Sequence, residues 1–428
     1  MPLRQLSRSV KPLRPSIRCL HTNHYRPSLP KRQQHQWQHH QHRPASSFAT
    51  NARSLFRQSP VGTTLATLTI LAGVGALIYT NYLYQSYIIG AFHNYPEPVA
   101  KKLRKALYYT NTDPNPQEAV KFYRQALQVA DEEGMDPFSD EVMGVKIQVA
   151  GLMEQVQQWG KAVEVLERIR ADNLEWVRRF GGKGELKRQR ARILAKTVAV
   201  SVKLGDLYGH PAIYDRETAE EQLVWAVETV LREKQRRQNE GVKEEDEGPW
   251  MSDEETGAAL ERLAGSYAEK EQHYLATPLY LQALSLQLAK DCHTVVLMNN
   301  LASSLAQQSP RAARAVQTYS QSTSIPNTSS ATAAGPVATR EQMVESARLW
   351  AQKALDVAKG IQAPERTEEC DVGCVVAMHN LGEFAEMGRD VQTARKRYAE
   401  AVGLARKIGF REGVENGEER LRKLRRGG

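Results

Sequence analysis

The sequence has no Asp or Glu in its first sixty positions, although Lys and Arg occur there eleven times. The whole chain contains 58 basic and 49 acidic residues, so its formal charge of +9 belongs to this N-terminal segment. The rest of the chain, with 47 basic residues, is slightly acidic. A folded region without an excess of basic residues does not favour nucleic acid as a partner.

The sequence also lacks the motifs of common catalytic sites, and it has little cysteine. It contains no Walker A loop, no His-Glu-x-x-His and no nucleophile elbow, so we predict a non-enzymatic protein without a cofactor. Four cysteines are too few for a disulfide scaffold in 428 residues.

The cysteines near the C-terminus leave two questions about their chemistry. Cys370, Cys374 and His379 could be part of a metal site, but no fourth ligand lies nearby, and buried thiols are the expected state. Whether Cys370 and Cys374 are oxidised stays open. Four-residue helical spacing is near the upper limit of Cα separation for a disulfide, so such a bond needs a distorted helix.

Residues 1–60 are rich in Arg and Ser, and apolar residues are spaced among the basic ones. This composition is typical of a disordered mitochondrial presequence, and a disordered basic tail is the alternative. The run of His and Gln from His35 to His42 could bind a metal ion, but a low-complexity spacer is expected.

The only long hydrophobic run lies at residues 61–84, within a stretch that has no charged residue between Arg57 and Glu97. A helix of ~24 residues, rising about 1.5 Å per residue, would cross a hydrocarbon layer of ~30 Å, so we predict one transmembrane helix. A buried core helix is the alternative, although it would normally have a polar face. Together with the predicted presequence, Arg53 and Arg57 on the near side predict a single-pass protein of the mitochondrial inner membrane, with its N-terminus in the matrix and the following domain in the intermembrane space. An outer-membrane signal anchor would instead place that domain in the cytosol.

Two stretches beyond this run share one pattern of apolar, small and aromatic residues. The shared offsets are those of Met378, Leu381, Gly382, Ala385, Ala394, Tyr398 and Ala401, and of Leu260, Leu263, Ala264, Tyr267, Ala276, Tyr280 and Ala283. Each half puts small residues on one helical face, where a second helix can approach closely. The pattern resembles the tetratricopeptide repeat, a helix-turn-helix unit of about 34 residues. The resemblance implies an all-α solenoid over residues 96–426, with about six hairpins and a C-terminal capping helix from Arg411.

Weaker matches complete the array and locate two inserts. Second helices are expected around Tyr123, Leu166, Leu223 and Ala351, and Asn115, Ser252 with Glu255, and Thr339 with Gln342 are expected to cap helices. Residues 235–253 are highly charged, and residues 307–340 are rich in Ser, Thr, Ala and Pro. We predict that both inserts are disordered.

A repeat array offers a concave surface lined by the first helix of each hairpin. By repeat position the predicted polypeptide-binding groove contains Lys203, Asp206, Glu261, Arg262, Asn299, Asn300, His379, Asn380 and Glu383. Asn300 and Asn380 precede the anchor leucine, where repeats of this family use Asn to grip a ligand backbone. Solvated side chains without a ligand are the alternative. Val295 and Val375 lie where chaperone-binding repeats need basic residues, so an apolar, extended or unfolded polypeptide is the expected ligand.

The leader, the span and the divergent repeats together resemble the fungal membrane-anchored adaptor subunits of the mitochondrial inner-membrane i-AAA protease. The resemblance is strongest from His379 to Glu386 and from Ile408 to Phe410. It implies a scaffold that binds unfolded or membrane polypeptides and delivers them to the AAA protease complex for protein quality control. An outer-membrane import receptor and a respiratory-complex assembly factor are the alternatives.

Overall fold

The computed structural model describes residues 59–287, 291–310 and 339–426. It separates into residues 1–88 and residues 89–428, which are described here one at a time. The predicted presequence up to residue 58 and residues 311–338 of the second predicted insert lie outside the described residues.

The described part of the first unit is a single apolar helix, α2 (Pro60–Leu83). The stretch Pro60–Ser86 is long and apolar enough to cross a membrane, and no residue of α2 is buried within the protein. Its threonines do not leave their hydroxyls free, because each donates to a backbone carbonyl one turn earlier; for example, Thr67 Oγ1 lies 2.7 Å from Thr63 O. This bonding lowers the cost of placing Thr in an apolar environment.

The second unit consists of helices, with no strand among the residues that the structure describes. Its helices are α3 (Glu97–Leu107), α4 (Pro116–Glu132), α5 (Asp140–Gln155), α6 (Trp159–Phe180), α7 (Lys187–Gly209), α8 (Arg216–Glu240), α9 (Glu244–Glu247), α10 (Asp253–Glu269), α11 (His273–Leu286), α12 (Cys292–Gln307), α14 (Arg340–Gly360), α15 (Glu368–Met387), α16 (Val391–Ile408) and α17 (Arg411–Arg426). Short π or 3-10 segments are η1 (Tyr84–Ile89), which begins in the first unit, η2 (Gly90–Phe92), η3 (Tyr108–Thr112) and η4 (Gly184–Leu186).

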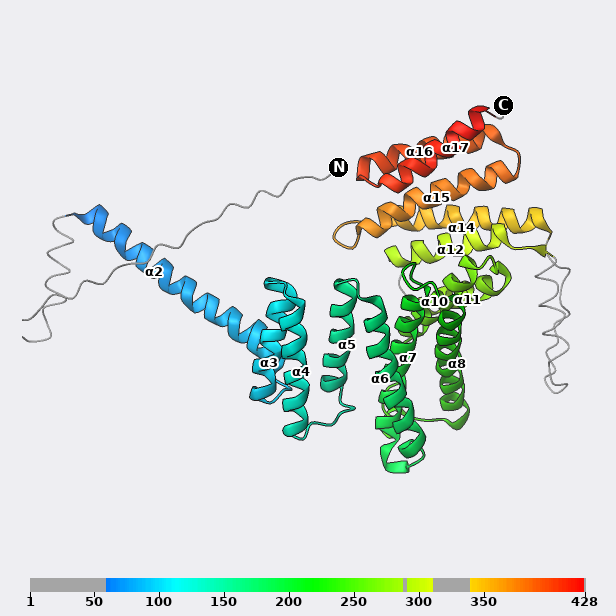
Figure 1. Ribbon diagram of the computed structural model, residues 1–428. Coiled ribbons are helices and arrows are strands. Elements are labelled where there is room, and N and C mark those ends of the chain that lie inside the picture. Colours follow the sequence, from blue (N-terminus) through cyan, green and yellow to red (C-terminus); the bar gives the residue numbers. More distant parts are fainter. Residues whose placement is uncertain (1–58, 288–290, 311–338, 427–428) are drawn as a thin grey trace, which may run out of the picture. The chain divides into compact units, whose positions relative to one another are not determined.

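Six helical hairpins follow one another along this unit, and neighbouring hairpins lie side by side (Figure 1). The pairs are α3 with α4, α5 with α6, α7 with α8, α10 with α11, α12 with α14, and α15 with α16, and α17 packs on α16. The predicted all-α fold with about six hairpins and a C-terminal helix is therefore confirmed.

Small residues at the repeat positions explain the close packing within a hairpin. Ala394 and Ala401 of α16 are fully buried, and Tyr398 between them is also completely covered. A Cβ atom on Gly382 of α15 would lie 2.7 Å from the Tyr398 ring. A Cβ atom on Gly205 of α7 would likewise lie 2.5 Å from the side chain of Leu223 of α8. Glycine at this position allows the first helix to contact the bulky residue of the second directly.

The predicted helix caps form where the sequence placed them. Asn115 accepts a hydrogen bond from the Glu118 backbone N–H at 3.2 Å. Ser252 with Glu255, and Thr339 with Gln342, form reciprocal capping boxes. These caps satisfy backbone donors that a helix start leaves unpaired, and they fix where α4, α10 and α14 begin.

The prediction that residues 235–253 are disordered is wrong. Helix α8 continues to Glu240, and α9 follows it. Glu247 of α9 is only 3% exposed, and it pairs with Arg236 of α8 and, at 3.2 Å, with Lys187 of α7. The segment is ordered because its acidic side chains neutralise basic ones from two helices, so its many charges do not keep it in solvent.

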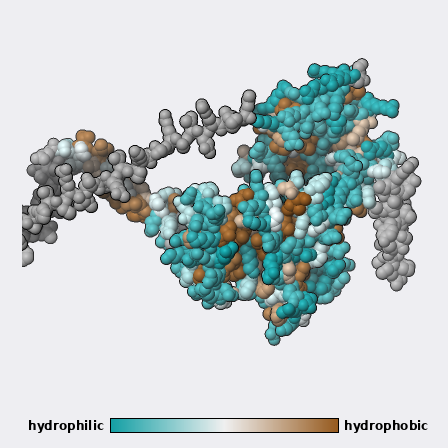
Figure 2. Space-filling view, viewed as in Figure 1, coloured by the Kyte–Doolittle hydropathy of each residue, from teal (hydrophilic) through white to brown (hydrophobic). Residues whose placement is uncertain are grey.

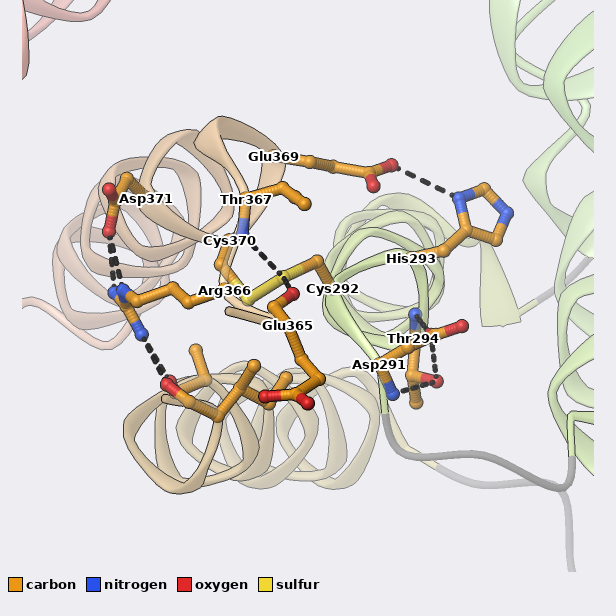
Figure 3. Close-up of a disulfide and its surroundings, with 12 residues drawn as sticks. Asp291, Cys292, His293, Thr294, Glu365, Arg366, Thr367, Glu369, Cys370 and Asp371 are labelled. Carbon is orange, nitrogen blue, oxygen red and sulfur yellow. Dashed lines mark hydrogen bonds and ion pairs between the residues drawn. A yellow bond between two sulfur atoms is a disulfide. The ribbon is translucent and has the colours of Figure 1, made fainter. Parts of the chain in front are cut away.

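The cysteine pairing also differs from the one that the sequence suggested. Cys370 forms a disulfide with Cys292, 78 residues earlier, and Cys374 is a buried free thiol. The solenoid places the start of α12 beside the first turn of α15, where the two Cα atoms are 4.6 Å apart (Figure 3). Cys374 lies one turn further along α15, so the regular helix keeps it away from Cys370.

Candidate functional site

The first helices of successive hairpins are joined by a row of polar contacts, which we call the polar row. Most of the predicted groove residues belong to it. Its contacts are Lys203 with Glu154 at 2.7 Å, Arg262 with Asp206 at 3.1 Å, His293 with Glu261 at 2.8 Å, His293 with Glu369 at 3.1 Å, and Arg420 with Glu383. The charged groove residues are therefore partly neutralised by neighbours in the chain, which reduces their value for recognising a charged ligand.

A pocket of about 370 Å³ opens between the third and fourth hairpins, and we call it the α7–α12 pocket. Four of the nine predicted residues, Asp206, Glu261, Arg262 and Asn300, line it. The other lining residues are Gly205, Gly209, His210, Pro211, Arg216, Ala219, Leu223, Gly265, Ser266, Glu269, Lys270 and Tyr280. The structure thus brings the central part of the predicted groove together in one place.

Tyr280 in this pocket differs from the tyrosines at the same repeat position elsewhere. The Tyr398 hydroxyl donates to Glu386 at 2.9 Å, and the Tyr123 hydroxyl lies 3.4 Å from Thr110 Oγ1. Glu386 precedes Tyr398 by 12 residues, whereas the residue at that distance before Tyr280 is Ala268. Within the described part of the chain the Tyr280 hydroxyl makes no hydrogen bond, although only 4% of the residue is exposed. The Tyr280 hydroxyl oxygen is not among the buried polar atoms that lack a partner, so it is accessible from the pocket and free to bond to a ligand there.

The electrostatics of the pocket keep this phenol protonated. Burial, and then the negative charges of Glu261 and Glu269, raise the pKa of Tyr280 to about 12. Burial also raises the pKa of Asp206, although the positive charges of Arg262 and Lys203 oppose this. The phenol can donate one hydrogen bond, and the Asn300 amide can both donate and accept. This combination matches the alternating N–H and C=O groups of an extended peptide backbone.

Asn299 and Asn380 do not line a groove, and their prediction as groove residues is wrong. Asn299 is 3% exposed, and its amide donates to Gly373 O at 2.9 Å. Asn380 is 7% exposed, and its amide donates to Asn299 O at 3.5 Å. Both residues hold α12 against α15, which approach closely because Gly373 has no side chain opposite Val295.

The remaining predicted residues lie away from the pocket. Lys203 pairs with Glu154 of the preceding hairpin. His379 lies 3.7 Å from Glu383, which Arg420 of α17 covers. Hydrogen bonding from His379, and then the Arg420 charge, lower the pKa of Glu383 against the opposing effect of burial. Helix α17 thus occupies the surface that a seventh hairpin would otherwise contact.

A second and more apolar hollow of about 1060 Å³ lies on α4, α5 and α6. Hydrophobic side chains reach the surface there, as Figure 2 shows between α4 and α6. The apolar side chains in its lining are Val120, Val149, Met153, Val165 and Ile169. The charged side chains in the lining are of both signs: Arg124, Lys146, Lys161 and Arg168 are basic, and Glu164, Glu167 and Asp172 are acidic. The repeat positions do not predict this hollow, because its residues belong to second helices as well as to a first helix.

No protein-family model matches the chain. A TPR repeat-containing protein of Schizosaccharomyces pombe (strain 972 / ATCC 24843) is 27% identical over 329 residues, which cover 75% of this chain and 76% of the relative. The fold is a tetratricopeptide-like α-solenoid. A Saccharomyces cerevisiae (strain ATCC 204508 / S288c) protein described as MRG3-like is 33% identical over 72 residues, 16% of each chain. This short match shows similarity to that protein in one segment.

Two solved structures align with the chain at low similarity. One is BtubC (BKLC) from P. vanneervenii, with 14% identity, 73% of this chain and 92% of that chain covered, and a TM-score of 0.35. The other is a signal transduction ATPase with a tetratricopeptide repeat sensor from Pyrococcus horikoshii, with 14% identity, 88% and 52% covered, and a TM-score of 0.39. Both TM-scores are below 0.5, so the fold assignment rests on the hairpins and their repeat spacing.

Proposed function

We propose that this protein is a non-enzymatic, membrane-anchored repeat scaffold that binds unfolded or membrane polypeptides and delivers them to the mitochondrial i-AAA protease complex. In this proposal α2 is the single transmembrane anchor in the inner membrane, and the solenoid faces the intermembrane space. The solenoid binds the client polypeptide, and the protease supplies the catalysis.

The observation that carries the proposal is the α7–α12 pocket with its unpartnered phenol. In the first and sixth hairpins the equivalent tyrosine bonds within the chain, whereas Tyr280 and Asn300 present hydrogen-bonding groups to an open pocket. These neutral groups recognise a peptide backbone without selecting side chains. The apolar hollow on α4 to α6 adds a surface for hydrophobic segments, which an unfolded membrane protein exposes.

The disulfide supports the proposed compartment. Disulfides are rare in the cytosol, where thiols are kept reduced, and they persist where the environment is oxidising. The Cys292–Cys370 bond lies inside the solenoid. A domain that carries it therefore fits the intermembrane space better than the cytosol, and this favours the inner-membrane anchor over an outer-membrane receptor.

The proposal is tested in intact mitochondria with a tagged full-length Y280F/N300A variant. We expect co-purification of the AAA protease to be retained, recovery of unfolded membrane polypeptides to fall, and their half-lives to lengthen. The matched control is Y123F, which alters the equivalent phenol in the first hairpin and should leave client recovery unchanged. Normal client recovery by Y280F/N300A would contradict the site. Recovery of respiratory subunits without protease would favour the assembly-factor alternative.

A further inference from the structure

The Cys292–Cys370 disulfide encloses one complete repeat. Cys292 is the first residue of α12 and Cys370 lies in the first turn of α15, so the 78-residue interval contains both helices of the fifth hairpin. The bond therefore ties the fifth hairpin to the sixth at the edge where the two hairpins meet.

The residues around the bond are arranged on both of its sides (Figure 3). On one side Arg366 pairs with Asp371 at 2.5 Å and donates to Ala358 O of α14 at 2.5 Å. On the other side His293 contacts Glu369 at 3.1 Å. These contacts join α12, α14 and α15 on either side of the disulfide (Figure 3).

The sulfur atoms are closed to macromolecules once these helices have packed. Cys292 is 4% exposed and Cys370 is fully buried. Thiol–disulfide exchange needs an in-line approach of a thiolate to a disulfide sulfur, which a protein partner cannot make through packed helices. Oxidation by a protein partner therefore has to precede the docking of α15 on α12 and α14.

We propose that a disulfide-carrying thiol oxidoreductase installs the Cys292–Cys370 bond while the fifth and sixth hairpins are still open, and that the packed solenoid then seals it. The thiolate of one cysteine attacks a sulfur of the partner's disulfide and displaces the partner's second sulfur as a thiolate. The thiolate of the other cysteine attacks the resulting mixed disulfide. The Cys292–Cys370 bond forms, and the partner leaves as a dithiol that has gained two electrons and, after protonation, two protons.

The third cysteine of the solenoid does not compete for this bond. Cys374 lies on the same regular helix as Cys370, with four-residue spacing that disfavours a bond between them. Once the helices have packed, burial raises the pKa of the Cys374 thiol, so it stays protonated and does not attack the finished Cys292–Cys370 bond. The fold therefore selects the pair that joins two hairpins over the pair that is nearer in sequence.

The first test counts thiols in the full-length C19S variant from mitochondria, alkylated after denaturation with a maleimide that adds mass. We expect one modified thiol, from Cys374, and three after prior reduction. The C19S/C374S control should show none before reduction and two after it. Three modified thiols without reduction would mean that the pair is not oxidised and would overturn the proposal.

The second test addresses the partner and the order of events. Removing one cysteine leaves the mixed disulfide unresolved, so C292S and C370S should each give a reductant-sensitive adduct in mitochondria, and C292S/C370S should give none. In vitro, oxidised protein disulfide isomerase should oxidise the unfolded, reduced chain at least about tenfold faster than the refolded, reduced chain. Absence of adducts from both single variants, or equal oxidation rates for unfolded and refolded chains, would overturn the proposal.

Discussion

Replacing Glu233 by Gln should destabilise the third hairpin and make the free energy of unfolding less dependent on pH in acid. Glu233 of α8 is 4% exposed and accepts hydrogen bonds from Arg236 at 2.6 Å and from Arg190 of α7 at 3.3 Å. Burial alone would raise the pKa of this carboxyl, but the hydrogen bonds and charges of Arg236 and Arg190 lower it from 4.5 to about 2.

The size of the effect follows from this difference. A pKa of about 2 in place of 4.5 corresponds to about 3 kcal/mol, at about 1.4 kcal/mol per pH unit. Because the folded-state pKa is the lower one, this stabilisation is fully present above pH 4.5 and is lost as the pH falls towards 2. Gln cannot carry the charge, so E233Q should lose about 3 kcal/mol near pH 7 and much less near pH 2.

The assay is urea denaturation of the full-length chain in detergent micelles, followed by circular dichroism between about pH 7 and pH 2.5. The matched control is E228Q on the same helix. It removes an exposed pair with Arg232 at 3.5 Å and should change the free energy of unfolding by less than about 0.5 kcal/mol. If the wild-type and E233Q free energies stay parallel over the whole pH range, the assignment of a lowered pKa to Glu233 is refuted.

Three further predictions concern packing, protonation and oxidation. G382A places a methyl group 2.7 Å from the Tyr398 ring and should lower the free energy of unfolding by about 1–3 kcal/mol, whereas G160A on α6 has open space and should not; thermal unfolding compares the two. Burial opposes the charged form of His293, but Glu369 and Glu261 raise its pKa overall, so its stabilisation is complete below pH 6.5 and is lost as the pH rises through the raised pKa. The H293Q variant should show no such loss of stability in unfolding curves recorded from about pH 6 to 9. A loss as large as that of the wild type would refute the raised pKa of His293. Reducing the Cys292–Cys370 bond opens a loop of 78 residues and should lower the free energy of unfolding by about 4 kcal/mol, as measured by urea denaturation with and without reductant; C374S should respond equally.

The fold could be predicted from the sequence because the residues that specify each hairpin lie close together in the chain. Alanines flanking an aromatic at fixed offsets, as around Tyr398, require a close-packed helix pair wherever they occur. The caps at Asn115 and Ser252 depend on residues three positions apart. Such local patterns need no knowledge of how hairpins stack.

The features that the sequence did not predict depend on contacts between distant residues. Glu247 meets Lys187, which lies on α7 far earlier in the chain, and this contact gives order to a segment whose composition is that of a solvated linker. Cys292 meets Cys370 only because the fifth hairpin folds between them. Asn299 is buried because α15 packs against it, and its hydrogen-bond partner Gly373 lies 74 residues later in the chain.

The part of the site that the sequence missed had a visible signal. Tyr280 occupies a core position of the repeat, so the repeat pattern alone predicts only a packing role for it. Comparison of the repeats shows Ala268 where the sixth hairpin has Glu386, the partner of the equivalent tyrosine. In Tyr280, a repeat tyrosine without a hydrogen-bond partner in its own hairpin therefore coincides with an open pocket.

Photo-crosslinking from the α7–α12 pocket tests most directly whether the solenoid binds unfolded polypeptides there. A benzophenone amino acid replaces the exposed Glu269 in the lining, and a control places it at the exposed Lys121 on α4, outside both hollows. Irradiation of intact mitochondria during import of a tagged, unfolded membrane polypeptide should give a crosslink from position 269 and none from position 121. Equal crosslinking from both positions, or none from position 269 in a chain whose circular dichroism is unchanged, would contradict the proposed role of the pocket.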